Sequence, residues 1–288
     1  MYDYDFHLVD LLFRVKSPFP MERFFELTPY LVAIDPQRQP DAVYRIAYLP
    51  EDWQICGQVL YQDRQTALYQ QGSQLHRYYF WNPHNKHAYL LLVQQRGSRE
   101  QILYLPQADL AHLLPDLRLS AFFCPEQLLL EHRAFQLHAS VIDWQGQGIL
   151  FSAPSGTGKS TQADLWQTHA GATILNGDRA VIRWLDSQYR VYGSPYAGSS
   201  GIYTNLSSPV RAIVTLEQGS ENSLRRLEAV EAFGRLYREI TVPSWDGDFV
   251  DKVSAELLGV IEQIPIYHLV CRPDADAVTL LQTEVTRL

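Results

Sequence analysis

The stretch ILFSAPSGTGKST, residues 149–161, decides the fold of the second half of this chain. It starts as an apolar strand, passes through a turn with Gly156 and Gly158, and ends in the pair Lys159-Ser160 that opens a helix. Glycines let backbone N–H groups curl around an anion, and the helix N-terminus adds further N–H groups. The pattern predicts a phosphate-binding loop (P-loop), although Ala153 stands where the strict pattern has its first glycine.

This loop predicts nucleotide binding with magnesium. The residues expected to hold the phosphates are Ser155, Gly156, Thr157, Gly158, Lys159, Ser160 and Thr161. Lys159 is expected to reach the β- and γ-phosphates, and the Ser160 hydroxyl is expected to ligate Mg²⁺. The N-K-x-D signal of guanine recognition has no convincing match in the second half of the chain, which favours ATP as the nucleotide.

Two further residues are candidates for the same site. In ATILNGDRAVI (172–182), Asp178 lies in a short turn between apolar segments, where a carboxylate would hold magnesium. The alternative is that Asn176-Gly177-Asp178 forms only a hairpin turn. His138 lies one strand before the loop strand, so hairpin pairing would bring it beside the phosphates for phosphate contact or proton transfer. A histidine in an apolar strand can also be a plain core residue.

The order LHASVIDWQGQGILFSAPSGTGKST…ATILNGDRAVI resembles the catalytic domain of the HPr kinase/phosphorylase family. That family shares its P-loop core with ATP-dependent phosphoenolpyruvate carboxykinase. The resemblance covers roughly residues 126–286. It implies an α/β P-loop kinase domain in which His138 and Asp178 belong to the site.

The chain departs from the family pattern at one important position. The resemblance implies an Asp pair that serves both the metal and the acceptor hydroxyl, but Gly177 stands where the first Asp would be. Either Asp178 serves both roles, or His138 is the base, or phosphoryl transfer has been lost. The segment of the family that recognises HPr is not found, so HPr is not expected as the substrate.

The predicted fold class is α/β (α+β), with a β-rich N-terminal domain (1–124) and a P-loop domain (125–288). In the first domain, short aromatic and β-branched segments separated by polar turns predict an antiparallel meander. These strands are expected at 42–50, 58–62, 76–81, 88–95 and 101–106. Trp53 and Trp81 are expected in the core or an interface, and the domain is expected to choose the substrate or partner.

The second half alternates between helical and strand patterns. Helices are expected at 126–135, 160–169, 227–240, 248–264 and 273–285. Strands are expected at 137–144, 148–153, 172–176, 180–184, 211–217 and 266–271. The Gly/Ser-rich loop 193–205 is expected to contact substrate.

Composition limits the possible partners. Of the 288 residues, 24 are Lys or Arg and 32 are Asp or Glu, so the net charge of −8 argues against nucleic acid and anionic membranes as partners. Three separated cysteines, no secretion signal and no apolar run of membrane-spanning length predict a cytoplasmic protein. His84 and His87 suit metal binding by their spacing, but a solvated turn is the preferred interpretation.

These features predict an ATP-dependent kinase that phosphorylates a hydroxyl of a peptide, protein or small molecule. Asp178, His138 and Lys159 are the expected catalytic residues, Ser160 and Asp178 the magnesium ligands, and ATP and Mg²⁺ the cofactors. Arg179 or Arg211 could neutralise charge on the transferred group, or form surface ion pairs instead. The alternative is a nucleotide-binding regulatory or assembly module without phosphoryl transfer. A homo-oligomer is compatible with the sequence.

Overall fold

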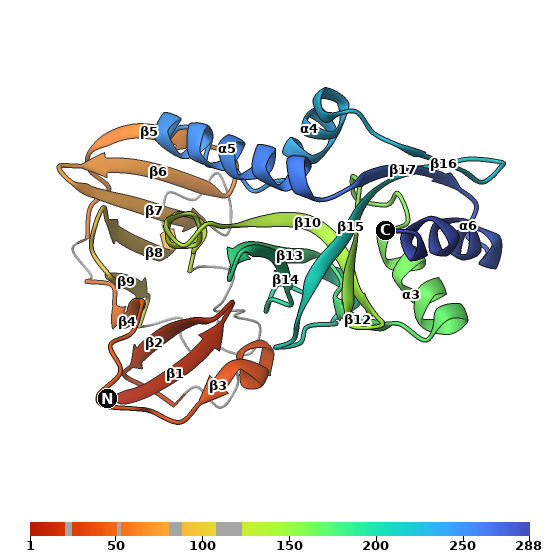
Figure 1. Cartoon of the computed structure of the whole chain (residues 1–288). Coiled ribbons are helices and arrows are strands. Elements are labelled where there is room, and N and C mark those ends of the chain that lie inside the picture. Colours follow the sequence, from red (N-terminus) through yellow and green to blue (C-terminus); the bar gives the residue numbers. More distant parts are fainter. Residues whose placement is uncertain (21–24, 51–52, 81–87, 108–122) are drawn as a thin grey trace. The chain divides into compact units, whose positions relative to one another are not determined.

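The computed structural model describes residues 1–20, 25–50, 53–80, 88–107 and 123–288 (Figure 1). It is a mixed α/β structure, rich in strands, with two mixed sheets. The chain divides into two compact units, residues 1–124 and 125–288. Each unit is described by itself.

The described part of the first unit has one nine-stranded sheet with the order β3-β1-β2-β4-β9-β8-β7-β6-β5. Its elements are β1 (Tyr2–Leu8), β2 (Leu11–Ser17), the 3₁₀ helix η1 (Phe25–Tyr30), β3 (Leu31–Val32), β4 (Ala42–Tyr48), β5 (Gln58–Gln62), β6 (Thr66–Gln71), β7 (Gln74–Phe80), β8 (Ala88–Gln95) and β9 (Glu100–Leu105). Strands β5 to β9 pair in succession as an antiparallel meander. The predicted antiparallel meander is confirmed for these strands but is wrong for β4, which pairs parallel to both β2 and β9.

Four strands of this unit, β1, β2, β3 and β6, were not expected from the sequence. The β1–β2 hairpin turns at Val9 and Asp10, both with φ of 56°. Such a two-residue turn is usually made by Asn-Gly or Gly, so the sequence carries no signal for it. Trp53 packs against a buried cluster and donates its indole N–H to the Tyr78 hydroxyl at 3.0 Å. Trp81 and the pair His84 and His87 lie outside the described residues.

The second unit combines an eight-stranded sheet with helices. Its elements are α2 (Glu126–Glu131), β10 (Ala134–Trp144), β11 (Gln147–Ser152), α3 (Lys159–Ala170), β12 (Thr173–Asn176), β13 (Arg179–Leu185), β14 (Gln188–Tyr192), the 3₁₀ helix η3 (Gly198–Ser200), β15 (Ser207–Gln218), β16 (Ser223–Arg226), α4 (Ala229–Tyr237), α5 (Gly247–Gln263), β17 (Ile266–Cys271) and α6 (Ala275–Thr286). Strands β14 and β16 were not expected. The helix predicted at 126–135 ends at residue 131, because Arg133 has a φ of 56° and β10 starts directly after it.

The strand pairings of this unit form a closed ring. Strand β11 pairs with both β10 and β15, and the chain of pairs β10–β13–β14–β15 completes the circuit. Two long strands make the closure possible: residues 134–138 of β10 pair with β13, and residues 139–144 pair with β11. Strand β17 extends the sheet parallel to β15. The carboxyl ends of β11, β15 and β17 therefore lie along the same edge.

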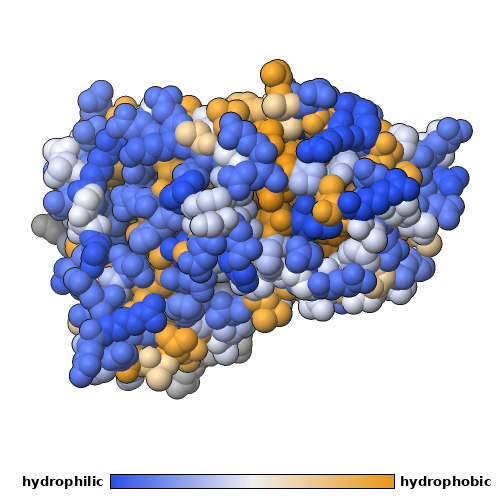
Figure 2. All heavy atoms as spheres, viewed as in Figure 1, coloured by the Kyte–Doolittle hydropathy of each residue, from blue (hydrophilic) through white to orange (hydrophobic). Residues whose placement is uncertain are grey.

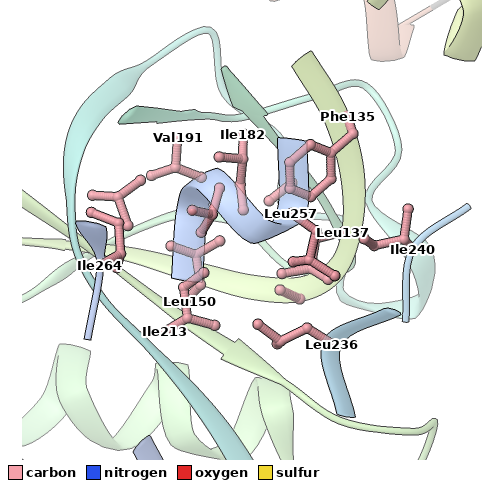
Figure 3. Close-up of a cluster of buried hydrophobic side chains, with 14 of the residues drawn as sticks. Phe135, Leu137, Leu150, Ile182, Val191, Ile213, Leu236, Ile240, Leu257 and Ile264 are labelled. Atoms are coloured by element: carbon pink, nitrogen blue, oxygen red, sulfur yellow. The ribbon is translucent and has the colours of Figure 1, made fainter. Parts of the chain in front are cut away.

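Two apolar clusters stabilise the second unit. One lies within the strand ring and against α4 and α5; Figure 3 shows Leu137, Leu150 and Ile182 from the strands together with Leu236 and Leu257 from the helices. The other lies between the sheet and the pair α3 and α6, around the fully buried Trp166. Trp166 packs edge-on against Trp144 with ring centroids 5.4 Å apart. These contacts fix α3, and with it the loop that connects β11 to α3, on the sheet.

The face drawn in Figure 2 is mainly hydrophilic, with apolar residues exposed in separate groups. Among the described helices, none combines the length and the apolar character needed to cross a membrane.

Candidate functional site

The predicted phosphate loop connects β11 to α3. Gly156 and Gly158 have φ of 80° and 112°, and Gly158 is the N-cap of α3. An added Cβ at either position would meet no atom within 4 Å. The backbone conformation, and not lack of space, therefore requires glycine there. Ser155, Gly156, Ser160 and Thr161 are exposed, and Thr157 and Gly158 are half-buried.

Lys159 lies beneath this loop and not in solvent. Its Nζ donates to the carbonyl oxygens of Ala153 at 2.8 Å and Pro154 at 3.3 Å, and the residue is 7% exposed. Burial lowers the pKa of Lys159, while the negative charges of Glu239 and Asp178 act in the opposite direction. The ammonium group is thus close to two carboxylates and directly below the loop.

Gln218, the last residue of β15, supports the outer part of the loop. Its side-chain Nε2 donates to the carbonyl oxygens of Gly156 at 3.2 Å and Thr157 at 3.5 Å. The sequence predicted no role for Gln218. Only the parallel pairing of β11 with β15 brings this residue to the loop.

Asp178 lies at a break between two strands that pair with the same neighbour. Strand β12 pairs with residues 141–143 of β10, and β13 pairs with residues 134–138, so Asn176-Gly177-Asp178 is not a hairpin turn. The buried Asn176 fixes the break: its Oδ1 accepts the Asp178 N–H at 2.9 Å, and its Nδ2 donates to the Ser194 carbonyl oxygen at 2.9 Å. Asp178 therefore lies between β12 and β13 and belongs to neither strand.

His138 connects Asp178 to Glu239. Its Nε2 lies 3.3 Å from Asp178 Oδ1, and its Nδ1 lies 2.8 Å from Glu239 Oε2. The pKa of Asp178 is lowered, first by the hydrogen bond from His138 and then by the positive charges of His138, Arg179 and Lys159, against the opposing effect of burial. The sequence predicted His138 and Asp178 but not Glu239, which follows α4 and carries no motif.

The strand hairpin brings His138 next to the phosphate loop, as the sequence predicted. Ala139 pairs with Ser152, the last residue of β11, and the Ser152 hydroxyl donates to the His138 carbonyl oxygen at 3.0 Å. His138, Asp178 and Lys159 therefore gather around the start of α3. The His138 ring is 24% exposed and lies between two carboxylates, so it packs among polar groups; its role at the site stays a prediction.

The loop 193–205 packs directly over this group. The Ser200 side chain fills the space beside Gly177: an added Cβ at Gly177 would lie 1.9 Å from Ser200 Oγ. An added Cβ at Gly198 would lie 2.7 Å from Asp178 Cγ. Backbone hydrogen bonds from Gly177 to Ile202 and from Arg179 to Tyr196 hold the loop in place.

The two candidate arginines differ in position. Arg179 neighbours His138 across the β10–β13 pair, lies 3.8 Å from Asp178, and donates to the Thr241 hydroxyl at 2.5 Å. Arg211 lies seven residues before Gln218 in β15, about 23 Å away at roughly 3.3 Å per residue. It donates to the Val285 carbonyl oxygen near the end of α6. The prediction that Arg211 could act at the site is wrong, and it forms no surface ion pair among the described residues.

The donor set suits magnesium only in part. Ser160 and Asp178 offer a hydroxyl and a carboxylate, the hard oxygen ligands that Mg²⁺ prefers. Within the described part of the chain, no group of three or more His, Cys, Asp and Glu side chains could hold a metal ion. Such a pair fits a Mg²⁺ ion that also binds phosphate oxygens, which is the usual arrangement at nucleotide sites.

A cleft of about 350 Å³ opens beside the loop. It is bounded by the loop and the first residues of α3 on one side, and by residues 218–219 and 271–273 on the other.

No protein-family model matches this sequence, and no curated protein matches it. Among solved structures, the Hpr(Ser) kinase/phosphatase from Coxiella burnetii shows a distant structural resemblance. It has 12% sequence identity and a TM-score of 0.31, over 53% of this chain and 88% of that chain.

Proposed function

We propose that this chain binds ATP on residues 155–161 and transfers the γ-phosphoryl group to the hydroxyl of a peptide, protein or small molecule. The observation that supports this proposal best is the group at the start of α3. Lys159 lies below the loop, and Asp178, His138 and Glu239 form a hydrogen-bonded row beside it. A cation beneath a phosphate loop and a carboxylate at its side are what phosphoryl transfer requires.

The loop supplies binding. Its backbone N–H groups and the N-terminus of α3 provide positive charge for the β- and γ-phosphates. With phosphate bound, Lys159 Nζ would exchange its bonds to the carbonyl oxygens of Ala153 and Pro154 for phosphate oxygens. Ser160 and Asp178 would hold Mg²⁺, which when bound neutralises charge on the phosphates.

Asp178 is the proposed base. The acceptor oxygen attacks the γ-phosphorus, the bond to the ADP oxygen breaks, and Asp178 takes the proton of the hydroxyl. His138 lies 3.3 Å from Asp178, and Glu239 holds its other ring nitrogen, so together they orient the carboxylate. The acceptor would approach beside the loop 193–205, which covers Asp178.

A nucleotide-binding module without phosphoryl transfer is the second candidate. It is favoured by Gly177, which has no side chain and whose neighbouring space is filled by Ser200. Only one carboxylate is therefore available at this break between β12 and β13, where the resembling kinases use two.

Nucleotide binding is tested with Lys159→Ala. Loss of charge-assisted hydrogen bonds worth about 1.5–3 kcal/mol should weaken Mg·ATP binding by at least about 10-fold in isothermal titration calorimetry. Lys252→Ala, at an exposed position of α5, is the matched control and should bind as the wild type does. Equal affinity of Lys159→Ala and wild type would disprove the phosphate loop.

Transfer is tested with γ-labelled ATP, magnesium and cell extract separated into small molecules and macromolecules. Wild type should label one of the two fractions, and Asp178→Asn should label it about 100-fold more slowly or less, as for loss of a general base. Label in one fraction would also reveal the class of acceptor. ATP binding without label in either fraction, and without slow ATP hydrolysis, would favour the binding module.

A further inference from the structure

The cleft of about 350 Å³ beside the phosphate loop has no part in the transfer chemistry proposed above. Its size lies in the range of small-molecule pockets, roughly 300–1,000 Å³. It opens at the shared carboxyl edge of the parallel strands β11, β15 and β17. In α/β sheets this edge is where ligands bind.

One residue that lines this cleft has a buried polar atom without a hydrogen-bond partner among the described residues. Gln162 is 2% exposed, and its Nε2 donates to the Cys271 sulfur at 3.2 Å. Its Oε1 is buried and accepts no hydrogen bond from any described residue. A buried carbonyl oxygen without a donor is unfavourable, so a ligand that brings an N–H to this point is favoured.

The position of the cleft beside the loop indicates which part of a bound nucleotide could enter it. In the proposed function, Lys159 and Asp178 lie at the γ-phosphate end of the nucleotide. The cleft is lined instead by Thr157, Gly158 and Thr161, together with Gln162. A nucleotide with its γ-phosphate near Asp178 would therefore extend its other end into the cleft.

We propose that this cleft receives the base and ribose of the bound nucleotide, with Gln162 Oε1 accepting a hydrogen bond from the base and the Cys271 thiol lying against it. The inference rests on the nucleotide binding proposed above. Arg272, half-exposed and held by Asp274 at 2.9 Å, lies at the rim. Its planar guanidinium group is suited to stacking on an aromatic base.

Protection of Cys271 from alkylation tests this inference on the full chain. N-ethylmaleimide labelling is followed by peptide mass spectrometry with no addition, with Mg·ATP and with Mg·tripolyphosphate. ATP at tenfold its Kd leaves about one protein in ten unbound, so labelling of Cys271 should slow about 10-fold. Tripolyphosphate, which has no base or ribose, should leave the rate unchanged. Cys56, which is exposed in the first unit, is the internal reference.

The outcomes separate this inference from the proposed function. Binding of both probes with no ATP-specific protection of Cys271 would overturn the nucleoside cleft and leave the phosphate loop intact. Equal protection by both probes would also overturn it, because closure of the loop would then suffice. Failure of both probes to bind would overturn the proposed function, and the cleft assignment with it.

A pair of variants tests the hydrogen bond itself. Gln162→Leu should weaken ATP binding about 3- to 10-fold, as for one neutral hydrogen bond, and leave tripolyphosphate binding unchanged. Gln167→Leu, at an exposed position of the same helix, should change neither. An equal loss of affinity for both probes in Gln162→Leu would show that Gln162 acts on the loop and not on the base.

Discussion

Glu239 shows how a site residue can escape the sequence. It lies 101 residues from His138, follows α4, and belongs to no motif, yet its Oε2 is 2.8 Å from His138 Nδ1. A carboxylate on one ring nitrogen fixes the orientation of the imidazole, so the other nitrogen is directed at Asp178. Glu239 is therefore a positioning residue in the proposed mechanism.

Glu239→Gln should lower the rate of transfer about 10- to 100-fold, as for other residues that orient a catalytic group. ATP affinity should change less than the rate, because the hydrogen bonds of Glu239 go to His138 and it acts on Lys159 through charge alone. The measurement is kcat against KM for ATP across pH, with Glu228→Gln, an exposed residue just before α4, as control. A change confined to KM would contradict the positioning role.

Asp178 gives a pH dependence of stability. Its pKa in the folded chain is below the ordinary value of 3.8, mainly because His138 donates to it. The carboxylate therefore stabilises the fold above about pH 4, and this contribution is lost as the pH falls through the folded pKa.

As the pH falls from 5 to 3, the wild type should lose more unfolding free energy than Asp178→Asn does, because only the wild type has this carboxylate to protonate. Urea unfolding at several pH values measures it. Asp164→Asn, which removes the same charge from an exposed position of α3, is the control. A difference that stays constant over this range would show that His138 does not stabilise the carboxylate.

At the level of elements, the break between β12 and β13 is the feature that forms the site. The two strands continue one another along β10, and Gly177 lies where they part. Pairing along one strand cannot be read from the apolar pattern, which is the same for a hairpin and for an interrupted strand. The loop 193–205 then packs on the break because Gly177 leaves room for Ser200.

Gly177→Ala should destabilise the fold by about 1–3 kcal/mol, as for other overpacked positions. The added Cβ would lie 1.9 Å from Ser200 Oγ and 2.6 Å from Ser200 Cβ. Thermal or urea unfolding of Gly177→Ala, Ser200→Gly and the double variant measures the coupling, and Ser200→Gly should relieve most of the cost. Gly234→Ala, where a Cβ meets nothing within 4 Å, is the control. Additive effects of the two changes would contradict the contact.

For the whole molecule, the two units differ in what they contribute to the site. The seven loop residues, Asp178, His138 and Glu239 all belong to residues 125–288. Both apolar clusters of this unit, including the ring interior and the α3–α6 layer, are formed by its own residues. A unit with its own core can fold alone.

The fragment 125–288 should therefore fold cooperatively and bind Mg·ATP with the affinity of the whole chain. Circular dichroism and calorimetry measure both properties, and Lys159→Ala in the fragment is the control for specific binding. A fragment that unfolds, or that folds without binding ATP, would show that the first unit is needed for the site.

The sequence by itself determined the strand, glycine turn and helix of residues 149–161, because these are local features with a local physical cause. It also predicted that His138 would lie by the loop, since a hairpin has one simple register. The closed strand ring and the break at Asp178 became known only from the tertiary structure. The same holds for the contacts of Glu239, Gln218 and Gln162. Each of these depends on pairing or packing between segments far apart in the chain, and residue type and periodicity carry no information about such pairings.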